Sequence, residues 1–196
     1  MLRHALLSVL AAAALHKAAA VDCRALPPPP PLPAFDLDRY VGDWYVQRIW
    51  GTGAGSTACM QMHYSESSSG GMTVVNTMRT LPYLNELQLS GIKRLANTSD
   101  PSKWLVYPNA GPLNIHPSPS WVVAVSPDYQ WSATAAGSPS QPSALGCVPE
   151  ERTGGMTIMT RLREPPADML KTALASMALL VRLPHKRSLR HAVLLY

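Results

Sequence analysis

The stretch that decides the fold is Phe35–Trp50, Phe-Asp-Leu-Asp-Arg-Tyr-Val-Gly-Asp-Trp-Tyr-Val-Gln-Arg-Ile-Trp. Asp36 and Asp38 predict a short turn or a single helical turn, because carboxylates accept hydrogen bonds from the unpaired N–H groups at a helix start. Gly42 then ends any helix and lets the backbone bend. The aromatic and β-branched residues that follow favour a strand. A large indole, Trp44, just past this bend indicates a side chain that fills one end of a closed sheet. The alternative is a core tryptophan on the first strand of any β domain.

Short strands with turn residues between them are predicted along most of the remaining chain. In Ala58–Ser65, every second residue is large and mainly apolar, as it is in Met72–Arg79, which is typical of strands with one buried face. Strands at this spacing indicate a barrel or a sandwich. The other expected strands are Glu86–Leu95, Lys103–Tyr107, Trp121–Val125, Gln130–Ala135 and Met156–Arg161.

A helix is predicted after the last strand. Ala167–Leu183 carries Leu170, Leu174, Met177 and Val181 at helical spacing, which gives a stripe that packs on a sheet.

Three short motifs occur in a specific order. Gly42-x-Trp44 opens the first strand, Asp128-Tyr129 lies between the sixth and seventh strands, and Arg161 ends the eighth. This order resembles that of the lipocalins, closest to the apolipoprotein D and bacterial or plant lipocalin branch, and the resemblance covers residues 35–183. It implies an all-β fold: an eight-stranded up-and-down antiparallel β-barrel of the calycin type, with a C-terminal α-helix packed outside.

The same resemblance implies a barrel floor, in which the guanidinium of Arg161 lies over the indole of Trp44. The sequence departs from the family in two places within the domain. Thr157 stands where the last strand usually has a tryptophan, which implies a wider cavity on that side. Residues Gly137–Gly155 are also longer than a simple hairpin loop.

An apolar ligand pocket is the expected functional site, because an eight-stranded barrel is just wide enough to enclose one small ligand. Strand alternation gives its inner face, and the matching of strands five and six adds three residues of less certain register. Asn76 is expected as a polar anchor. The alternative is that the same residues only fill a core. The predicted pocket residues are Met60, Met62, Tyr64, Val74, Asn76, Met78, Trp104, Val106 and Trp121.

The two ends of the chain are expected to lie outside the barrel domain. Residues 1–20 resemble a secretory signal peptide, with a basic start, a short apolar run and Ala18-Ala-Ala20 as a cleavage site. Residues 21–34 form a proline-rich arm, and residues 184–196 form a basic tail. The tail could make weak contact with acidic lipid headgroups, although solvation is its default state.

The net charge of +5 comes mainly from these ends. Without the signal peptide and the stretch after Asp168, the chain has ten basic and twelve acidic residues. A nucleic-acid-binding domain carries its basic face on the fold itself, so no nucleic-acid partner is expected.

Three cysteines in a secreted chain allow one disulfide and one free thiol. The resemblance to apolipoprotein D implies a Cys23–Cys147 bond, and Cys59–Cys147 is the alternative. Asn97-Thr-Ser99 is a glycosylation sequon in the turn between strands four and five.

No catalytic residues, metal ligands or cofactors are expected. The six histidines are scattered, and the sequence has no nucleophile elbow, P-loop or dinucleotide fingerprint. The sequence therefore predicts a non-enzymatic, secreted carrier of a small hydrophobic molecule, such as a fatty acid, sterol, retinoid, bilin or carotenoid. Two alternatives remain: an enzyme on the same fold, of isomerase or xanthophyll de-epoxidase type, and an interaction protein with a filled barrel. An isomerase would need a cysteine inside the barrel, whereas Cys59 is expected on its outer face.

Overall fold

The computed structural model describes residues 22–25, 27–32, 34–50, 57–68, 71–82, 85–96, 99–109, 116–143, 146–149, 155–181 and 193–194. The barrel strands are β1 (Gly42–Trp50), β2 (Thr57–Glu66), β3 (Met72–Thr80), β4 (Asn85–Leu95), β5 (Lys103–Pro108), β6 (Ser118–Val125), β7 (Trp131–Ala135) and β10 (Met156–Thr160). The other elements are η1 (Cys23–Ala25), α1 (Leu37–Tyr40), β8 (Gln141–Ser143), β9 (Gly146–Val148), α2 (Ala167–Val181) and β11 (Val193–Leu194).

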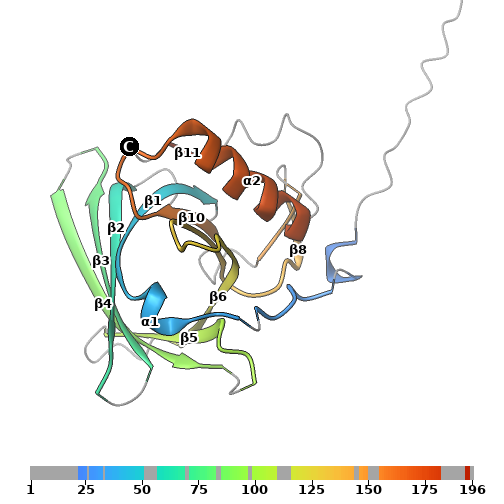
Figure 1. Ribbon diagram of the computed structural model, residues 1–196, viewed down its shortest axis with the longest axis horizontal. Helices are drawn as coiled ribbons and strands as arrows, with labels where there is room; N and C mark the ends of the chain where they lie inside the picture. Colours follow the sequence, from blue (N-terminus) through green and yellow to red (C-terminus); the bar gives the residue numbers. More distant parts are fainter. Residues whose placement is uncertain are drawn as a thin grey trace, which may run out of the picture.

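The barrel has up-and-down topology. Each of its strands pairs antiparallel with the next one along the chain, and β10 closes the sheet by pairing with β1 from Tyr45↔Thr160 to Trp50↔Met156. The strands curve around one interior, and α2 lies outside them (Figure 1). The predicted fold is therefore confirmed. The separate hairpin β8–β9 explains why the connection between β7 and β10 is longer than a simple loop.

The stretch before β1 forms the single helical turn that the sequence predicts. Asp36 is its N-cap, and its Oδ1 accepts from the backbone N–H groups of Asp38 at 3.0 Å and Arg39 at 3.3 Å. After Val41 the chain turns sharply at Gly42, whose φ of +101° suits a residue without a Cβ. This turn directs Trp44 into the barrel, where its side chain is fully buried.

A bulge near the start of β2 keeps its apolar side chains inside. Cys59 has a φ of +50°, and the pairing of β2 with β3 shifts between Ala58 and Gln61. As a result, Cys59 is exposed while its neighbour Met60 is buried. The expected position of Cys59 outside the barrel agrees with this arrangement.

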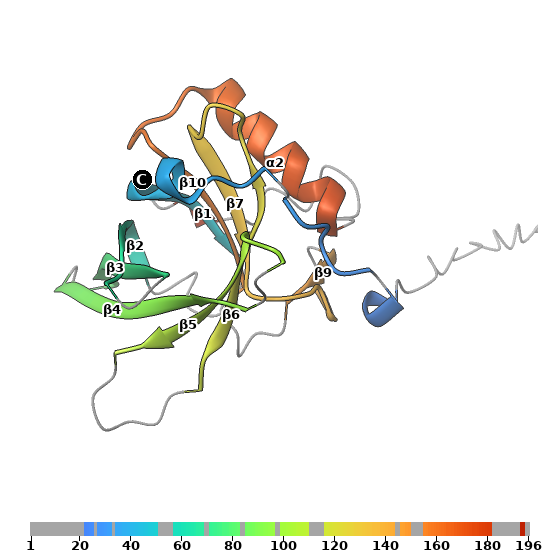
Figure 2. The same ribbon diagram turned by 60° about the horizontal axis from the view of Figure 1, so that its bottom comes forward.

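Helix α2 packs on the outer faces of β6 and β7 and beside β9 (Figure 2). Ala173 and Met177 of the helix are buried in a cluster with Ala133 of β7 and Ile158 of β10. Burial of this stripe holds the helix against the sheet because each apolar side chain leaves water.

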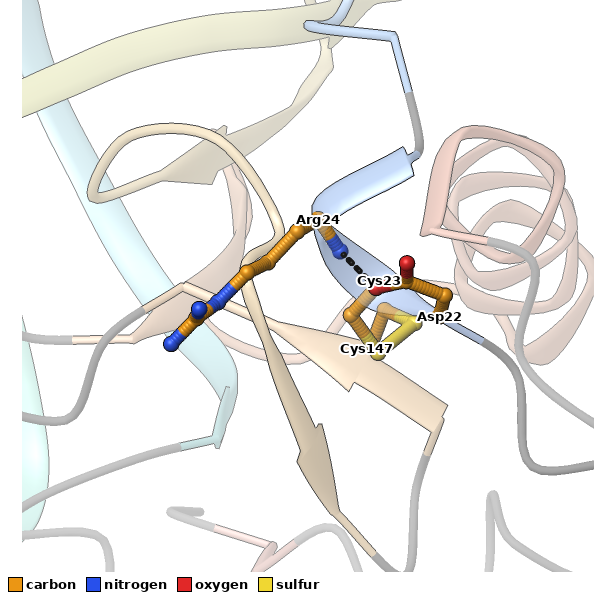
Figure 3. The surroundings of a disulfide bond; sticks show 4 residues. All are labelled: Asp22, Cys23, Arg24 and Cys147. Atoms are coloured by element: carbon orange, nitrogen blue, oxygen red, sulfur yellow. Dashed lines mark hydrogen bonds between the residues drawn. A yellow bond between two sulfur atoms is a disulfide. The ribbon is translucent and has the colours of Figure 1, made fainter.

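Cys23 and Cys147 form a disulfide with an S–S distance of 2.02 Å and a Cα–Cα distance of 5.3 Å. The bond joins η1 to β9, beside the Asp22 carboxylate that accepts from the backbone N–H of Arg24 at 3.0 Å (Figure 3). This is the pairing expected first. The alternative Cys59–Cys147 pairing is wrong, because Cys147 is already bonded and Cys59 is a free, exposed thiol.

Several expectations fall outside the described residues. They are the signal peptide of residues 1–20, the Asn97 sequon and most of the tail of residues 184–196. Of the tail, Val193 and Leu194 form β11 and pair with Arg48 and Ile49 of β1. Among the helices of the described ranges, none is both long and apolar enough to span a membrane.

Candidate functional site

The barrel has a cavity of about 220 Å³ that both apolar and polar side chains line. Its apolar lining includes Met62, Val74 and Val106 of β2, β3 and β5. Hydroxyl groups line it from β6, β7 and β10. These hydroxyl residues are Ser118, Ser120, Thr134 and Thr157. The arrangement can hold a small molecule with an apolar part and a polar part.

Eight of the nine predicted pocket residues lie inside the barrel, in two groups. Met62, Tyr64, Val74, Asn76 and Val106 line the cavity. Met60, Met78 and Trp104 are buried in the apolar cluster inside the barrel and do not line this cavity. The interior is therefore part cavity and part filled core.

Trp121 is the predicted pocket residue that the structure places elsewhere, so this expectation was wrong. Trp104 pairs with Ser120, and Trp121 pairs with Lys103. Because side chains alternate between faces, Ser120 shares the inner face with Trp104, and Trp121 points outward. There Trp121 packs against the cluster under α2, with the Nζ of Lys103 5.1 Å from its ring centroid.

Lys93 of β4 is the main cavity residue that the sequence analysis missed. Its side chain is 3% exposed and lines the cavity. Its Nζ donates to Ser120 Oγ at 2.8 Å and to Tyr64 Oη at 3.3 Å. A sequence signal existed, because Leu87, Leu89, Gly91 and Lys93 occupy alternate positions of one strand. That alternation puts the lysine on the same face as the leucines.

Burial changes the acid–base properties of this pair. Desolvation lowers the pKa of Lys93 from 10.5 to about 7, so the amine is partly neutral near neutral pH. Desolvation also raises the pKa of Tyr64 well above 10, with the neighbouring Tyr40 adding to the effect, so its hydroxyl stays protonated and can donate. The Nζ of Lys93 lies 4.5 Å from the centroid of the Tyr64 ring. This contact favours the charged amine, in opposition to the effect of burial.

The other polar groups around the cavity differ in whether they have hydrogen-bond partners. The hydroxyls of Thr134 and Thr157 bond to each other across β7 and β10. Asn76 lines the cavity, and its buried Oδ1 has no hydrogen-bond partner among the described residues. The expected polar anchor therefore has an acceptor that a ligand could use.

Apolar side chains continue from the cavity along β4. Leu87 and Leu89 are 40% and 49% exposed, and they pair with Met78 and Asn76 of β3. By alternation they share the face of Lys93. Exposed leucines on an inner face form an apolar rim at the open end of the barrel, suited to contact with part of a ligand.

At the opposite end, Arg161 and Trp44 are in contact as the resemblance implies. The guanidinium carbon of Arg161 lies 3.9 Å from the centroid of the Trp44 ring. The same guanidinium donates to the carbonyls of Arg39, Val41 and Asp43 at 2.7–2.9 Å. A Cβ at Gly42 would come within 3.1 Å of it, so the glycine is needed for this close approach. The indole N–H of Trp44 donates to the carbonyl of Tyr40 at 2.8 Å.

Asp128 and Tyr129 complete this closed end. Asp128 lies in the β6–β7 turn, and its Oδ1 accepts from the backbone N–H of Gln130 at 3.2 Å. Tyr129, with a φ of +60°, accepts from the backbone N–H of Asp36 at 2.6 Å through its hydroxyl. Arg39 lies over the Tyr129 ring at 4.3 Å. These contacts tie α1 to the turn, so the motif residues serve to close the barrel.

Potentially reactive side chains of the described residues occur in one further hollow. A second hollow, of about 240 Å³, includes Cys59, Arg79, Glu86 and Arg163. Its cysteine is exposed, and neither it nor the glutamate has a histidine among the lining residues. Across the described ranges, no cluster of histidine, cysteine, aspartate or glutamate side chains could hold a metal ion.

No family model matches the sequence, and no curated protein is similar to it. Solved structures of lipocalins show the same fold. Insecticyanin from the tobacco hornworm Manduca sexta is 14% identical, with 80% of each chain covered and a TM-score of 0.59. Lobster apocrustacyanin A1 is 12% identical over 76% of this chain and 74% of its own, with a TM-score of 0.54. The cockroach allergen Per a 4 is 16% identical over 76% and 82%, with a TM-score of 0.53.

Proposed function

We propose that this chain is a secreted lipocalin that binds and carries a small hydrophobic molecule inside its barrel. The observation that supports this most is the cavity of about 220 Å³ bordered by Met62, Val74 and Val106. It exceeds the ~150 Å³ of an engineered apolar cavity that binds benzene. Methionine in the wall adapts to the shape of a ligand, which suits a carrier.

Binding accounts for the site better than catalysis does. The interior holds hydroxyl groups, an amide and one amine, but no cysteine or histidine among the residues that line the cavity. The isomerase hypothesis needs a thiol inside the barrel, and Cys59 is exposed. The filled-barrel hypothesis accounts for the part of the interior around Trp44 and Trp104, and leaves the cavity unexplained.

Native mass spectrometry of the protein from a secreting host tests the proposal directly. We expect a co-purified small molecule, or uptake of the neutral fluorescent probe N-phenyl-1-naphthylamine by the empty protein. The same spectrum reports removal of residues 1–20 and any glycan at Asn97, which we propose as well. A protein that is folded, empty and unable to take up the probe would favour the interaction-protein hypothesis.

A substitution in the wall locates the binding site. Met62→Arg should reduce probe binding at least tenfold, because the long cationic side chain would occupy the cavity and make it polar. The barrel should remain folded, since Met62 is only half-buried and arginine can extend its charged head toward water. His63→Arg is the matched control, because His63 is exposed on the opposite face of the same strand. Equal binding by both variants would place the ligand elsewhere.

The finer assignments remain proposals. The order of the three sequence motifs supports the lipocalin family, and within it we propose the apolipoprotein D and bacterial or plant lipocalin branch. The disulfide supports an extracellular location, because such bonds persist in oxidising compartments. The basic tail could contact acidic membrane surfaces weakly, and binding to anionic vesicles that high salt abolishes would support this contact.

A further inference from the structure

Lys93 is a buried amine that has no negatively charged partner among the described residues. Only 3% of it is exposed, and within the described part of the chain no carboxylate forms an ion pair with it. Desolvation by burial is what shifts its pKa. An apolar side chain at this position would fill the barrel without the cost of removing an amine from water. A role in packing alone therefore does not explain a lysine here.

The neighbouring strands surround the amine with neutral groups. Tyr64 of β2 and Ser120 of β6 bond to its Nζ, while Met72 of β3 and Val106 of β5 pair with it across the sheet. The titratable group among these four is the tyrosine, and burial keeps it protonated. None of these described groups supplies a negative charge, so a molecule in the cavity could supply one.

The hydroxyl groups beside Lys93 are suited to an anionic oxygen. Tyr64 Oη now donates to the sulfur of Met62 at 3.1 Å, and a thioether is a weak acceptor. Ser120 Oγ lies 2.8 Å from Nζ and can turn its proton toward the cavity. A carboxylate placed against these groups would accept from an ammonium and two hydroxyls. Such charge-assisted bonds are stronger than neutral ones.

We propose that the cavity binds a small amphipathic monocarboxylic acid, whose carboxylate is held by Lys93, Ser120 and Tyr64. The inference rests on the proposed carrier function and narrows it to one ligand class. The hydrocarbon part of the acid lies along Met62, Val74 and Val106 and leads toward the exposed leucines of β4. A single lysine matches a single negative charge, which fits a monocarboxylate better than a more highly charged phosphate.

Displacement of N-phenyl-1-naphthylamine by dodecanoic acid and by 1-dodecanol tests the proposal on the full-length chain from a secreting host. The two competitors have the same carbon chain and differ in the charged head. We expect the acid to bind about ten- to one-hundred-fold more tightly than the alcohol at pH 6.5, since hydrogen bonds to charged groups are worth that much. Equal affinities would overturn the proposal while leaving the carrier function intact. Failure of the probe and both competitors to bind would overturn the carrier function itself.

Two variants assign the preference to the amine. Lys93→Met keeps an unbranched side chain, one atom shorter than that of lysine, and removes its charge. The variant should therefore bind the alcohol as well as the wild type does and lose the preference for the acid. Lys171→Met is the control, because Lys171 is exposed on α2 outside the barrel, and it should keep the preference. A Lys93→Met protein that still favours the acid would overturn the proposal.

Proton uptake by the wild type gives a readout that needs no variant. Calorimetry of acid binding at pH 8 in buffers of different ionisation enthalpy should show uptake of a fraction of a proton, because a bound carboxylate raises the pKa of the amine above its value in the empty cavity. The affinity for the acid should fall as the pH rises above about 7. Binding without proton uptake and with a flat pH profile would contradict the proposal.

Discussion

The closed end of the barrel and its cavity use buried polar groups in opposite ways. At the closed end, Trp44 and Arg161 each donate to carbonyls of the chain, and the hydroxyl of Tyr129 binds the backbone of Asp36. At the cavity, Lys93 has no anion among the described residues, and Asn76 Oδ1 has no partner. The first arrangement stabilises the fold, and the second lowers stability at a place where a ligand can supply what is missing.

The two regions therefore have different roles: the polar groups of the closed end support the fold, and those of the cavity are available to a ligand. Buried polar groups without partners lower the stability of a fold. Such unfavourable features tend to occur at functional sites. Substitutions should therefore have opposite signs at the two regions: truncation at the closed end should destabilise the protein, and removal of the charge at the cavity should stabilise it.

The largest effect is expected for Trp44→Ala. The substitution removes a fully buried indole and leaves a void beneath Arg161, so it should lower the free energy of unfolding by ~3–5 kcal/mol. Met62→Ala at the cavity wall should cost only ~1 kcal/mol, because that side chain is half-buried and already borders open space. Urea unfolding of both variants measures the difference. Similar losses for the two would mean that the closed end is no better packed than the cavity.

The next largest effect concerns the arm that leads from the disulfide to the closed end. The bond links residues 124 positions apart, and its loss in a Cys23→Ser, Cys147→Ser double variant should cost ~2–4 kcal/mol. Leu32 and Phe35 of the same segment pack on the interior cluster, so the loss should appear as lower thermal stability. Probe binding at 20 °C should be unchanged. The Cys59→Ser control should change stability by less than ~0.5 kcal/mol, and a larger loss there would mean that Cys59 has a structural role.

Lys93→Met should have an effect of opposite sign that depends on pH. The pKa of Lys93 is lowered from 10.5 to about 7 on folding, so between these values the unfolded chain binds the extra proton and wild-type stability rises with pH. This shift corresponds to about 5 kcal/mol. Loss of the hydrogen bonds to Ser120 and Tyr64 offsets part of it, so the variant should be more stable than the wild type by on the order of 3 kcal/mol at pH 6. This gain should shrink toward pH 10. Thermal melts at both values measure it, and a destabilised variant at pH 6 would show that the amine is better solvated than its burial indicates.

Much of the fold could be predicted because its determinants are local. Gly42 and Trp44 mark the first strand, and alternation places Met62 and Val74 inside without knowledge of their partners. Trp121 was misplaced because its orientation depends on the register between β5 and β6, which a single strand does not specify. Ser118 and Ser120 were missed because the strand was expected to begin only at Trp121, whereas β6 begins at Ser118.

The short pairing of β11 with β1 has a consequence for association between molecules. Among the described residues, β1 pairs with β2 only as far as Tyr45, although the strand continues to Trp50. Beyond Tyr45, the edge on the β2 side would leave backbone N–H and C=O groups open to a strand of another chain. Val193 and Leu194 pair with Arg48 and Ile49 on this edge. Their pairing covers part of this strand edge, and an uncovered edge is a place where strands of other chains can pair.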